Sequence, residues 1–312
     1  MSGAIKMLLS PARLNQLLRT DAPKTVVLDC SWFMPNSDRS GKAEFRKKRI
    51  PGSNFLDLDE VASHHELGLK HMLPSEEVFA RACEKLGIAP SSRVVMYDTH
   101  GVFSSPRALW MMRAFGHQDS AILDGGLPRW EAEGFPIEST EPQEETLEKV
   151  HYDIPTLAPN AVRSYQQIVS NSALIPFQTA GAELVLDARG RGRFMGTEAD
   201  PRSGVASGHI PNSVSVPFDT FLQKHVAQNG STYTTLLPEP ELRAALVDVM
   251  GADSAQAVFN GDIPVITSCG SGMTAAVLWL GLQTIGVKQI SIYDESWAGY
   301  GVRSSSKIET SH

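Results

Sequence analysis

The residue with the most evident chemistry is Cys269, in the run Val-Ile-Thr-Ser-Cys-Gly-Ser-Gly-Met-Thr-Ala at residues 265–275. The apolar residues before the thiol predict a short strand, the glycines predict a tight turn, and residues 275–284 predict an apolar helix. A thiol in this place faces backbone N–H groups and the positive end of a helix dipole, and both favour the nucleophilic thiolate. The alternative interpretation is an inert cysteine of the core.

The composition of the chain limits its possible functions. Its 312 residues suffice for about two domains, and a hydrophobic content of 42% suffices for globular cores. A formal net charge of −7 argues against non-specific binding to nucleic acid or to an anionic membrane. The cysteines Cys30, Cys83 and Cys269 are odd in number and far apart, which favours a reducing compartment over a disulfide framework or a zinc site.

The location of the protein follows from the same features. No apolar run approaches the roughly 18 residues of a membrane span. The first twenty residues contain basic side chains and no acidic one, which fits a weak transit peptide. The sequence Ser10-Pro11 followed by spaced leucines is more typical of an amphipathic helix. We therefore expect a cytoplasmic protein, with the mitochondrion as an additional location.

The sequence contains two related halves. Four segments of the first half, 26–30, 49–53, 94–98 and 123–126, resemble four of the second, 184–188, 209–213, 265–269 and 293–296, in the same order. Such a repeat indicates two copies of one fold, and it aligns Asp98 with Cys269. An insertion of about ten residues in the second half accounts for the changing offset, and we expect it in the polar stretch 225–234, whose composition predicts a loop.

Each half alternates short apolar strands with helical patterns, which is typical of a parallel sheet covered by helices. We therefore predict an α/β fold of two similar domains, each a parallel sheet with helices on both faces. Residues 1–145 form the first domain, residues 146–160 a linker poor in apolar periodicity, and residues 161–312 the catalytic domain. Because an aspartate cannot do thiol chemistry, we expect the first domain to be a scaffold in which Asp98 caps a helix.

Three chemistries compete for the loop after Cys269. The G-x-G-x-x-A pattern at 270–275 fits a dinucleotide site, with Asp294 at a suitable distance, but too few residues follow to complete a nucleotide-binding sheet. A cysteine phosphatase needs an arginine six residues after the thiol, where this chain has Ala275. Sulfur transfer needs a thiolate that carries a second sulfur as a persulfide, an anion that the amides of residues 270–274 can cradle.

The chain resembles the tandem-domain rhodanese-type sulfurtransferases over nearly its whole length. The resemblance rests on residues 187–189, 192–194, 209–211 and the loop at 269–274. The Cys-Gly-Ser-Gly loop is similar to that of members that use 3-mercaptopyruvate, whereas members that use thiosulfate carry cationic residues after the cysteine.

The resemblance implies an activity. Sulfur passes from 3-mercaptopyruvate through a Cys269 persulfide to a thiol or cyanide, and pyruvate is released. Thiosulfate as donor, and a persulfide relay to a protein partner, are the alternatives. The resemblance implies no metal or organic cofactor, and it implies a thiol acceptor such as a thioredoxin-like protein.

The resemblance also implies the residues of the site. Arg193 and Arg202 match the family's arginines for the substrate carboxylate, a group that guanidinium binds bidentately. The remaining matches are a proposed relay of Ser271, His71 and Asp59, and the substrate-binding loop residues Gly270, Gly272, Met273 and Thr274. The chain departs from the family at Glu295, in Asp-Glu-Ser-Trp, where members often have glycine.

Overall fold

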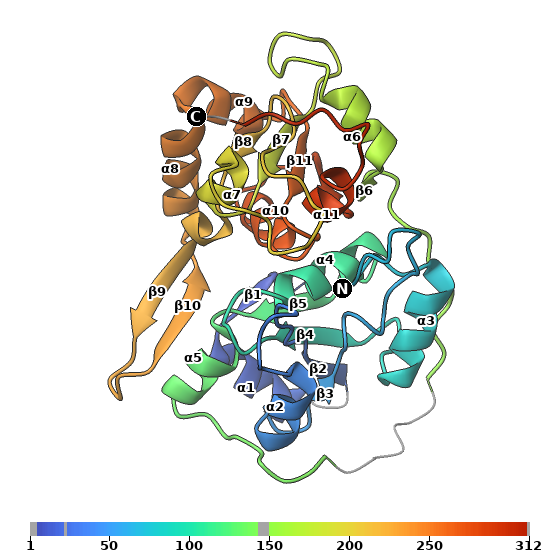
Figure 1. The fold of residues 1–312 in the computed structure, drawn as a ribbon. Coiled ribbons are helices and arrows are strands. Elements are labelled where there is room, and N and C mark those ends of the chain that lie inside the picture. Colours follow the sequence, from blue (N-terminus) through green and yellow to red (C-terminus); the bar gives the residue numbers. More distant parts are fainter. Residues whose placement is uncertain (1–4, 22–23, 143–149, 311–312) are drawn as a thin grey trace. The chain divides into compact units, whose positions relative to one another are not determined.

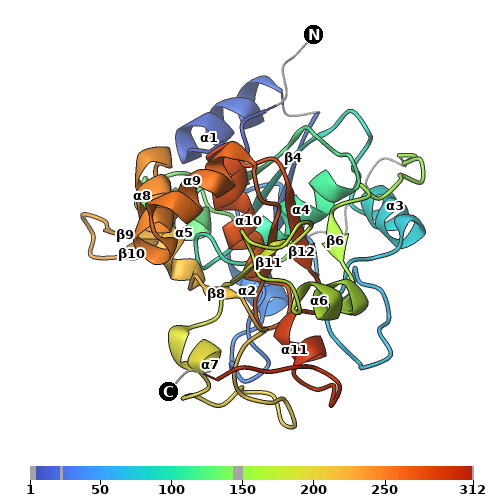
Figure 2. The same ribbon diagram turned by 90° about the horizontal axis from the view of Figure 1, so that it is seen from above.

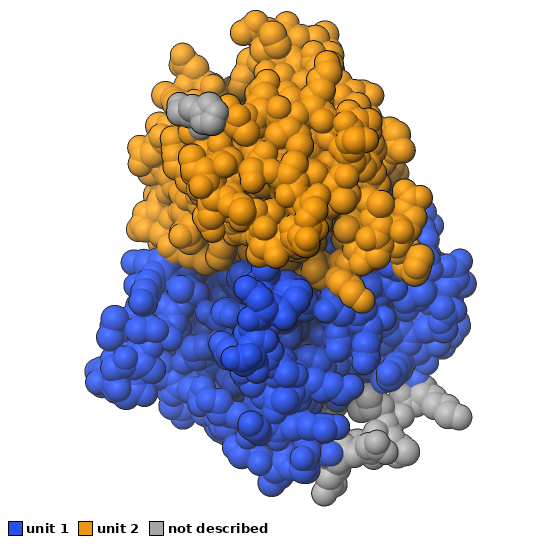
Figure 3. Space-filling view, viewed as in Figure 1, with its two compact units in different colours: residues 1–63, 73–158, 223–236 blue, residues 64–72, 159–222, 237–312 orange. Residues whose placement is uncertain are grey.

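The computed structural model describes residues 5–21, 24–142 and 150–310 and contains two compact units (Figure 1). Unit 1 comprises Met1–Ser63, Leu73–Ala158 and Gln223–Leu236, and unit 2 comprises His64–Met72, Pro159–Leu222 and Leu237–His312. Figure 3 colours the two units separately. Each unit therefore includes one short segment from the other half of the chain.

Unit 1 is built on a five-stranded parallel sheet. In spatial order its strands are β1 (Leu8–Leu9), β5 (Ser120–Leu123), β4 (Arg93–Tyr97), β2 (Thr25–Asp29) and β3 (Asn54–Phe55). Its helices are α1 (Pro11–Thr20), α2 (Gly41–Lys47), α3 (Glu76–Lys85), α4 (Ser105–Ala114) and α5 (Gly126–Ala132).

Both faces of this sheet are buried. Val95 and Leu123 pack in one cluster with Leu14 of α1 and Trp130 of α5. Alternate strand residues point to the opposite face, and Met96 there is also fully buried. Because the strands are buried on both faces, their sequences are the continuous apolar runs from which a parallel sheet was predicted.

Helix α1 confirms the prediction of an amphipathic helix near the N-terminus. The Ser10 hydroxyl accepts a hydrogen bond from the Arg13 N–H at 3.3 Å, and Pro11 occupies the first turn. Leu14 and Leu17 are buried on its inner side. No helix in the described part of the chain is long and apolar enough to cross a membrane.

Unit 2 repeats the strand order of unit 1, again with parallel pairs. Its strands are β6 (Val162–Arg163), β12 (Ile290–Tyr293), β11 (Val265–Ser268), β7 (Leu184–Asp187) and β8 (Val214–Ser215). Its helical elements are α6 (Tyr165–Asn171), α7 (Arg191–Met195), the 3-10 helix η2 (Phe218–Phe221), α8 (Glu239–Met250), α9 (Ala252–Asn260), α10 (Ala275–Thr284) and α11 (Ser296–Tyr300). Figure 2 gives a second view of β11, β12 and α10, which pack together. The predicted fold class is confirmed.

The expectation of a loop at 225–234 was wrong, because most of it forms a hairpin of β9 (Leu222–Val226) and β10 (Thr232–Leu236). Threonines and Tyr233 favour extended structure, and the Asn-Gly sequence at 229–230 makes the turn. The His225 ring stacks on Tyr233 with ring centroids 4.9 Å apart. The Leu236 N–H donates to the Asp124 carboxylate at 2.9 Å, which attaches the hairpin to unit 1.

The predicted linker lies partly outside the described residues, which omit 143–149. Its described part, residues 150–160, contains no helix or strand; residues 150–158 belong to unit 1 and residues 159–160 to unit 2. The Ala158 N–H donates to the Ala114 carbonyl at 2.9 Å, and the Tyr152 hydroxyl lies 3.0 Å from His117 Nδ1.

Candidate functional site

Cys269 directly follows β11, the central strand of the unit 2 sheet, and lies in the loop before α10. Sites in parallel sheets form at this edge, where the strands reach their carboxyl ends. The residue is 2% exposed, and its N–H donates to the Ser296 hydroxyl at 3.0 Å. The sequence therefore places one thiol at the edge of the sheet where ligands bind.

Backbone hydrogen bonds from α11 fix the start of the loop after Cys269. The carbonyls of Cys269 and Gly270 accept hydrogen bonds from the N–H groups of Trp297 and Ala298 in α11, both at 2.9 Å. Gly272 has a φ of +82°, a conformation that side chains disfavour. Within the described part of the chain, the N–H groups of four loop residues meet no acceptor, and these are Gly270, Ser271, Met273 and Thr274. The loop thus offers donors for an anion.

Ser296 is a site residue that the sequence analysis missed. Its hydroxyl accepts the Cys269 N–H, donates to the Tyr293 carbonyl at 2.8 Å, and lies 4.0 Å from Cys269 Sγ. Its φ of +49° is unusual for serine and directs the chain into α11. The motif Asp-Glu-Ser-Trp, noted only for Glu295, was the available signal.

Arg202 lies against the Cys269 loop. Its Nη1 is 3.2 Å from the position that a Cβ atom at Gly270 would take. The same guanidinium is 3.3 Å from Asp200, whose side chain is 1% exposed. A cation therefore stands beside the loop, although the loop sequence itself contains none.

The other arginines of this region differ in their surroundings. Arg193, in α7, is half-buried and makes no hydrogen bond or ion pair with a described residue. Arg189 is structural, because it is 2% exposed, pairs with Asp187 at 2.7 Å and covers the Trp297 ring at 4.2 Å. Arg191 is exposed. Among these three arginines, Arg193 is thus a half-buried one whose guanidinium makes no hydrogen bond or ion pair with a described residue and could bind a ligand.

The side chain of His71 contacts a backbone carbonyl of the loop. Its Nε2 lies 2.7 Å from the carbonyl oxygen of Ser271, and the residue is 3% exposed. Since a carbonyl only accepts hydrogen bonds, Nε2 carries a proton in this contact. Asp59 belongs to unit 1, where it accepts a hydrogen bond from Trp32 Nε1 at 3.1 Å. Cys269, Ser271, His71 and the two predicted arginines all belong to unit 2.

Asp98 occupies the equivalent place in unit 1 and is surrounded by donors. Its carboxylate accepts the N–H groups of residues 100, 101, 103, 104 and 105 and the Ser105 hydroxyl, at 2.7–3.1 Å. This geometry fits the structural role expected for Asp98 at the start of α4. A loop of this kind can therefore direct many N–H groups at one anion.

The other two cysteines have environments that suppress reactivity. Burial raises the pKa of the Cys83 thiol to about 12, and burial beside Asp29 and Asp98 raises the pKa of the Cys30 thiol well above its usual range. Both thiols therefore stay protonated near neutral pH, and the protonated form is a poor nucleophile.

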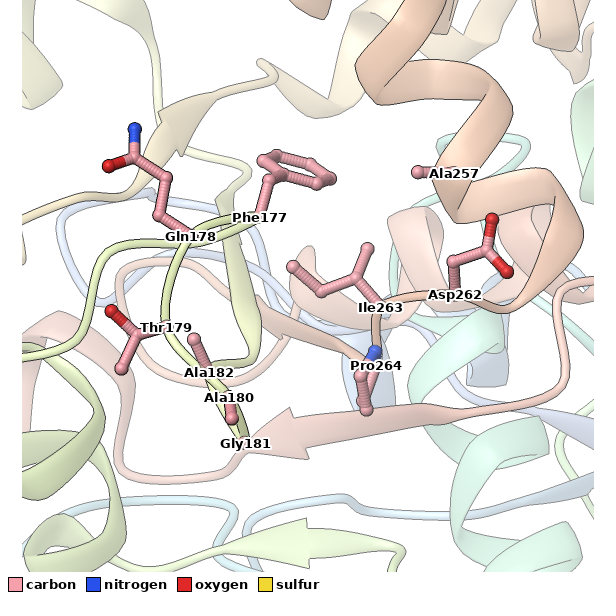
Figure 4. Close-up of a pocket in the computed structure, with 10 residues that line it drawn as sticks. All are labelled: Phe177, Gln178, Thr179, Ala180, Gly181, Ala182, Ala257, Asp262, Ile263 and Pro264. Atoms are coloured by element: carbon pink, nitrogen blue, oxygen red, sulfur yellow. The ribbon is translucent and has the colours of Figure 1, made fainter.

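Unit 2 also has a hollow away from Cys269. A hollow of about 520 Å³ lies before β7 and β11, at the sheet edge opposite Cys269 (Figure 4). Phe177 borders it on one side and Ala257 of α9 on the other. Among the described residues, no group of three or more His, Cys, Asp and Glu side chains forms a potential metal site.

The known proteins that this chain resembles belong to one family. Residues 10–133 and 173–302 each match the rhodanese-like domain. The chain is 37% identical over 290 residues to a probable 3-mercaptopyruvate sulfurtransferase of Schizosaccharomyces pombe, covering 93% of this chain and 91% of the other. It is 36% identical over 306 residues to the mitochondrial thiosulfate/3-mercaptopyruvate sulfurtransferase 1 of Arabidopsis thaliana, covering 92% and 74%.

A solved structure extends the match. The sub-stoichiometric sulfur transferase subunit of yeast mitochondrial complex I superposes with a TM-score of 0.80 at 29% identity, covering 98% of this chain and 100% of that one. This chain thus shares the fold of that subunit over nearly its whole length.

Proposed function

Because this chain belongs to the tandem-domain rhodanese family of sulfurtransferases, we propose that it moves sulfur from 3-mercaptopyruvate through a persulfide on Cys269. One observation carries the proposal. The Cys269 thiol stands at the carboxyl end of the central strand, next to loop N–H groups without a described acceptor. The chain is accordingly an enzyme, a 3-mercaptopyruvate sulfurtransferase.

The proposed reaction has two displacement steps at sulfur. The Cys269 thiolate attacks the sulfur of mercaptopyruvate, an S–S bond forms, and the C–S bond breaks. The electron pair of the broken C–S bond passes to the carbon, which gives the enolate of pyruvate, and the enolate then takes up a proton. A thiol acceptor, as thiolate, or cyanide then attacks the outer sulfur, and the S–S bond breaks to return the Cys269 thiolate. The loop N–H groups stabilise the anionic sulfur in both steps.

The proposed donor site uses charges near the loop. Arg202 beside Gly270, and Arg193, which has no partner among the described residues, bind the carboxylate of mercaptopyruvate. The amides and side chains of Gly270, Ser271, Gly272, Met273 and Thr274 enclose the sulfur and the carbonyl of the donor. A relay of Ser271, His71 and Asp59 is one proposal for these residues, and the contact between His71 Nε2 and the Ser271 carbonyl supports a second one, in which His71 positions the loop.

Two alternatives have support of their own. The guanidinium of Arg202 beside the loop could bind thiosulfate, which is an anion. The Arabidopsis relative is named for both donors. A relay to a protein partner is favoured by the relative that is a subunit of complex I. A thioredoxin-like protein is the proposed thiol acceptor, and the cytoplasm the proposed location, with the mitochondrion in addition. We also propose residues 161–312 as the catalytic domain and 1–145 as a scaffold, joined by 146–160.

Steady-state kinetics test the proposal. Pyruvate release from 3-mercaptopyruvate and sulfite release from thiosulfate are measured side by side, with a small thiol and with cyanide as acceptors. Cys269→Ser should abolish turnover and leave the thermal unfolding temperature unchanged. Cys83→Ser is the matched control, since that thiol is buried in unit 1 and should leave turnover intact. Substantial sulfur transfer by folded Cys269→Ser would refute the proposal.

A further inference from the structure

The two halves of the chain exchange equivalent segments. The segment His64–Met72 lies between β3 and α3 in the sequence but belongs to unit 2. The hairpin segment Gln223–Leu236 lies between β8 and α8 but belongs to unit 1. Since β3 and β8 hold the same place in the two sheets, the exchanged segments are also counterparts in the repeat.

Each exchanged segment holds the same atom of the loop that it reaches. In unit 2, His71 Nε2 contacts the carbonyl of Ser271, the second residue after Cys269, at 2.7 Å. In unit 1, the Thr234 hydroxyl donates to the carbonyl of His100, the second residue after Asp98, at 3.1 Å. The residue after the held carbonyl is a glycine with positive φ in both loops.

The held carbonyl fixes the direction of the next N–H group. A trans peptide is planar, so its C=O and N–H point in opposite directions. In unit 1, Thr234 holds the His100 carbonyl on one side, and the Gly101 N–H donates to Asp98 Oδ1 at 2.8 Å on the other. The side-chain contact therefore orients a donor toward the residue that aligns with the catalytic thiol.

We infer that His71 is a positioning residue, which holds the Ser271 carbonyl and thereby directs the Gly272 N–H at the sulfur on Cys269. It does not act as a base that takes a proton from the Ser271 hydroxyl. The inference rests on the proposed function, because the group so oriented stabilises the thiolate and the persulfide of that reaction.

The comparison of the two loops separates this role from a relay. Thr234 has no acid–base chemistry near neutral pH, and the loop it holds contains an aspartate in place of the thiol. The contact is thus present where no nucleophile needs activation. In unit 2, the protonated Nε2 of His71 donates a hydrogen bond to the Ser271 carbonyl and has no lone pair left to accept a second proton.

Substitutions by a neutral donor test the inference. Glutamine places an amide N–H at nearly the reach of His Nε2 but cannot serve as a base near neutral pH. We expect His71→Ala to lower kcat/KM for 3-mercaptopyruvate about ten- to a hundredfold, and His71→Gln to stay within about threefold of the unmodified enzyme. The pH profile of kcat/KM should keep its shape in His71→Gln.

Two controls accompany these variants. Thr234→Val removes the equivalent contact from unit 1 and should lower the unfolding temperature with kcat/KM unchanged. His71→Asn tolerates the φ of +45° at this position but is too short to reach Ser271. It should therefore fold and lose activity as His71→Ala does, which covers the case in which the alanine variant is unstable.

Defined results would overturn the inference. If folded His71→Gln is as impaired as His71→Asn, or loses a limb of the pH profile, His71 acts as a base. Hydrogen exchange of the amides of 270–274 gives a readout independent of turnover, and it should speed up in His71→Asn but not in His71→Gln. If the unmodified protein transfers no sulfur, the proposed function fails, whereas unequal exchange in the two variants still supports the positioning role.

Discussion

Arg202 occupies the space that a side chain at Gly270 would need. Its Nη1 lies 3.2 Å and its Nη2 3.5 Å from the position of a Cβ atom there. A side chain at position 270 would therefore meet this guanidinium closely. Through this contact, the residue type at position 270 affects the position of the guanidinium proposed to bind the carboxylate of the sulfur donor.

Gly270→Ala should impair donor binding more than stability. The added methyl group displaces the end of a flexible side chain, which the fold tolerates, and shifts the guanidinium away from the loop by a few tenths of an ångström. We expect KM for 3-mercaptopyruvate to rise about three- to tenfold and kcat to change less. Gly190→Ala is the matched control, since nothing lies within 4 Å of its added Cβ. An unchanged KM in Gly270→Ala would show that Arg202 does not meet the donor.

Removal of either predicted carboxylate arginine should weaken use of 3-mercaptopyruvate. The loss of one charge-assisted contact costs about 1.5–3 kcal/mol, or about ten- to a hundredfold in kcat/KM, in Arg193→Ala and in Arg202→Ala. The exposed neighbour gives the control Arg191→Ala, which should behave as the unmodified enzyme. The unmodified enzyme should prefer 3-mercaptopyruvate to thiosulfate, and the reverse preference would make thiosulfate sulfurtransferase the better assignment.

Ser296→Ala should slow the reaction and destabilise unit 2. The change leaves the Cys269 N–H and the Tyr293 carbonyl without their buried partner, at a cost of about 1–3 kcal/mol. We expect a lower unfolding temperature and a kcat reduced about tenfold, because the strand end that carries the thiol loses its anchor. The comparison with Ser213→Ala, whose hydroxyl bonds a carbonyl away from Cys269, separates local from general destabilisation. Equal kcat values in the two variants would contradict the role of Ser296.

Asp29 should make stability depend on pH. Burial, with a smaller contribution from Asp98, raises the pKa of Asp29 from 3.8 to about 7. One carboxylate oxygen accepts the Ser31 N–H, and the other is buried without a partner among the described residues. The folded protein keeps this proton up to a higher pH than the unfolded chain does. The free energy of unfolding should therefore fall as pH rises from about 4 to 7 and then level off.

The variant Asp29→Asn tests this dependence. It keeps the acceptor for Ser31 and removes the ionisation, so it should gain on the order of 1–3 kcal/mol relative to the unmodified protein above pH 7 and much less near pH 4. Asp187, the counterpart in unit 2, pairs with Arg189, so Asp187→Asn should destabilise at all these pH values. Urea unfolding at several pH values measures both, and a constant difference between Asp29→Asn and the unmodified protein would contradict the assignment.

The sequence by itself determined the features that depend on local pattern. Apolar runs and helix signals predicted two parallel α/β domains, the repeat aligned Asp98 with Cys269, and the glycines after the thiol predicted the strand, loop and helix that the structure contains. These predictions succeed because side-chain periodicity and turn chemistry act between residues close in sequence.

Only the tertiary structure decided which distant residues reach the loop. It placed segment 64–72 in unit 2 and segment 223–236 in unit 1, whereas the sequence suggested contiguous domains and a loop at 225–234. It directed His71 to a carbonyl of the loop, brought Arg202 against Gly270, and joined Ser296 to Cys269. Such contacts depend on how strands far apart in the chain pair and where the connections between them pack, which no local pattern encodes.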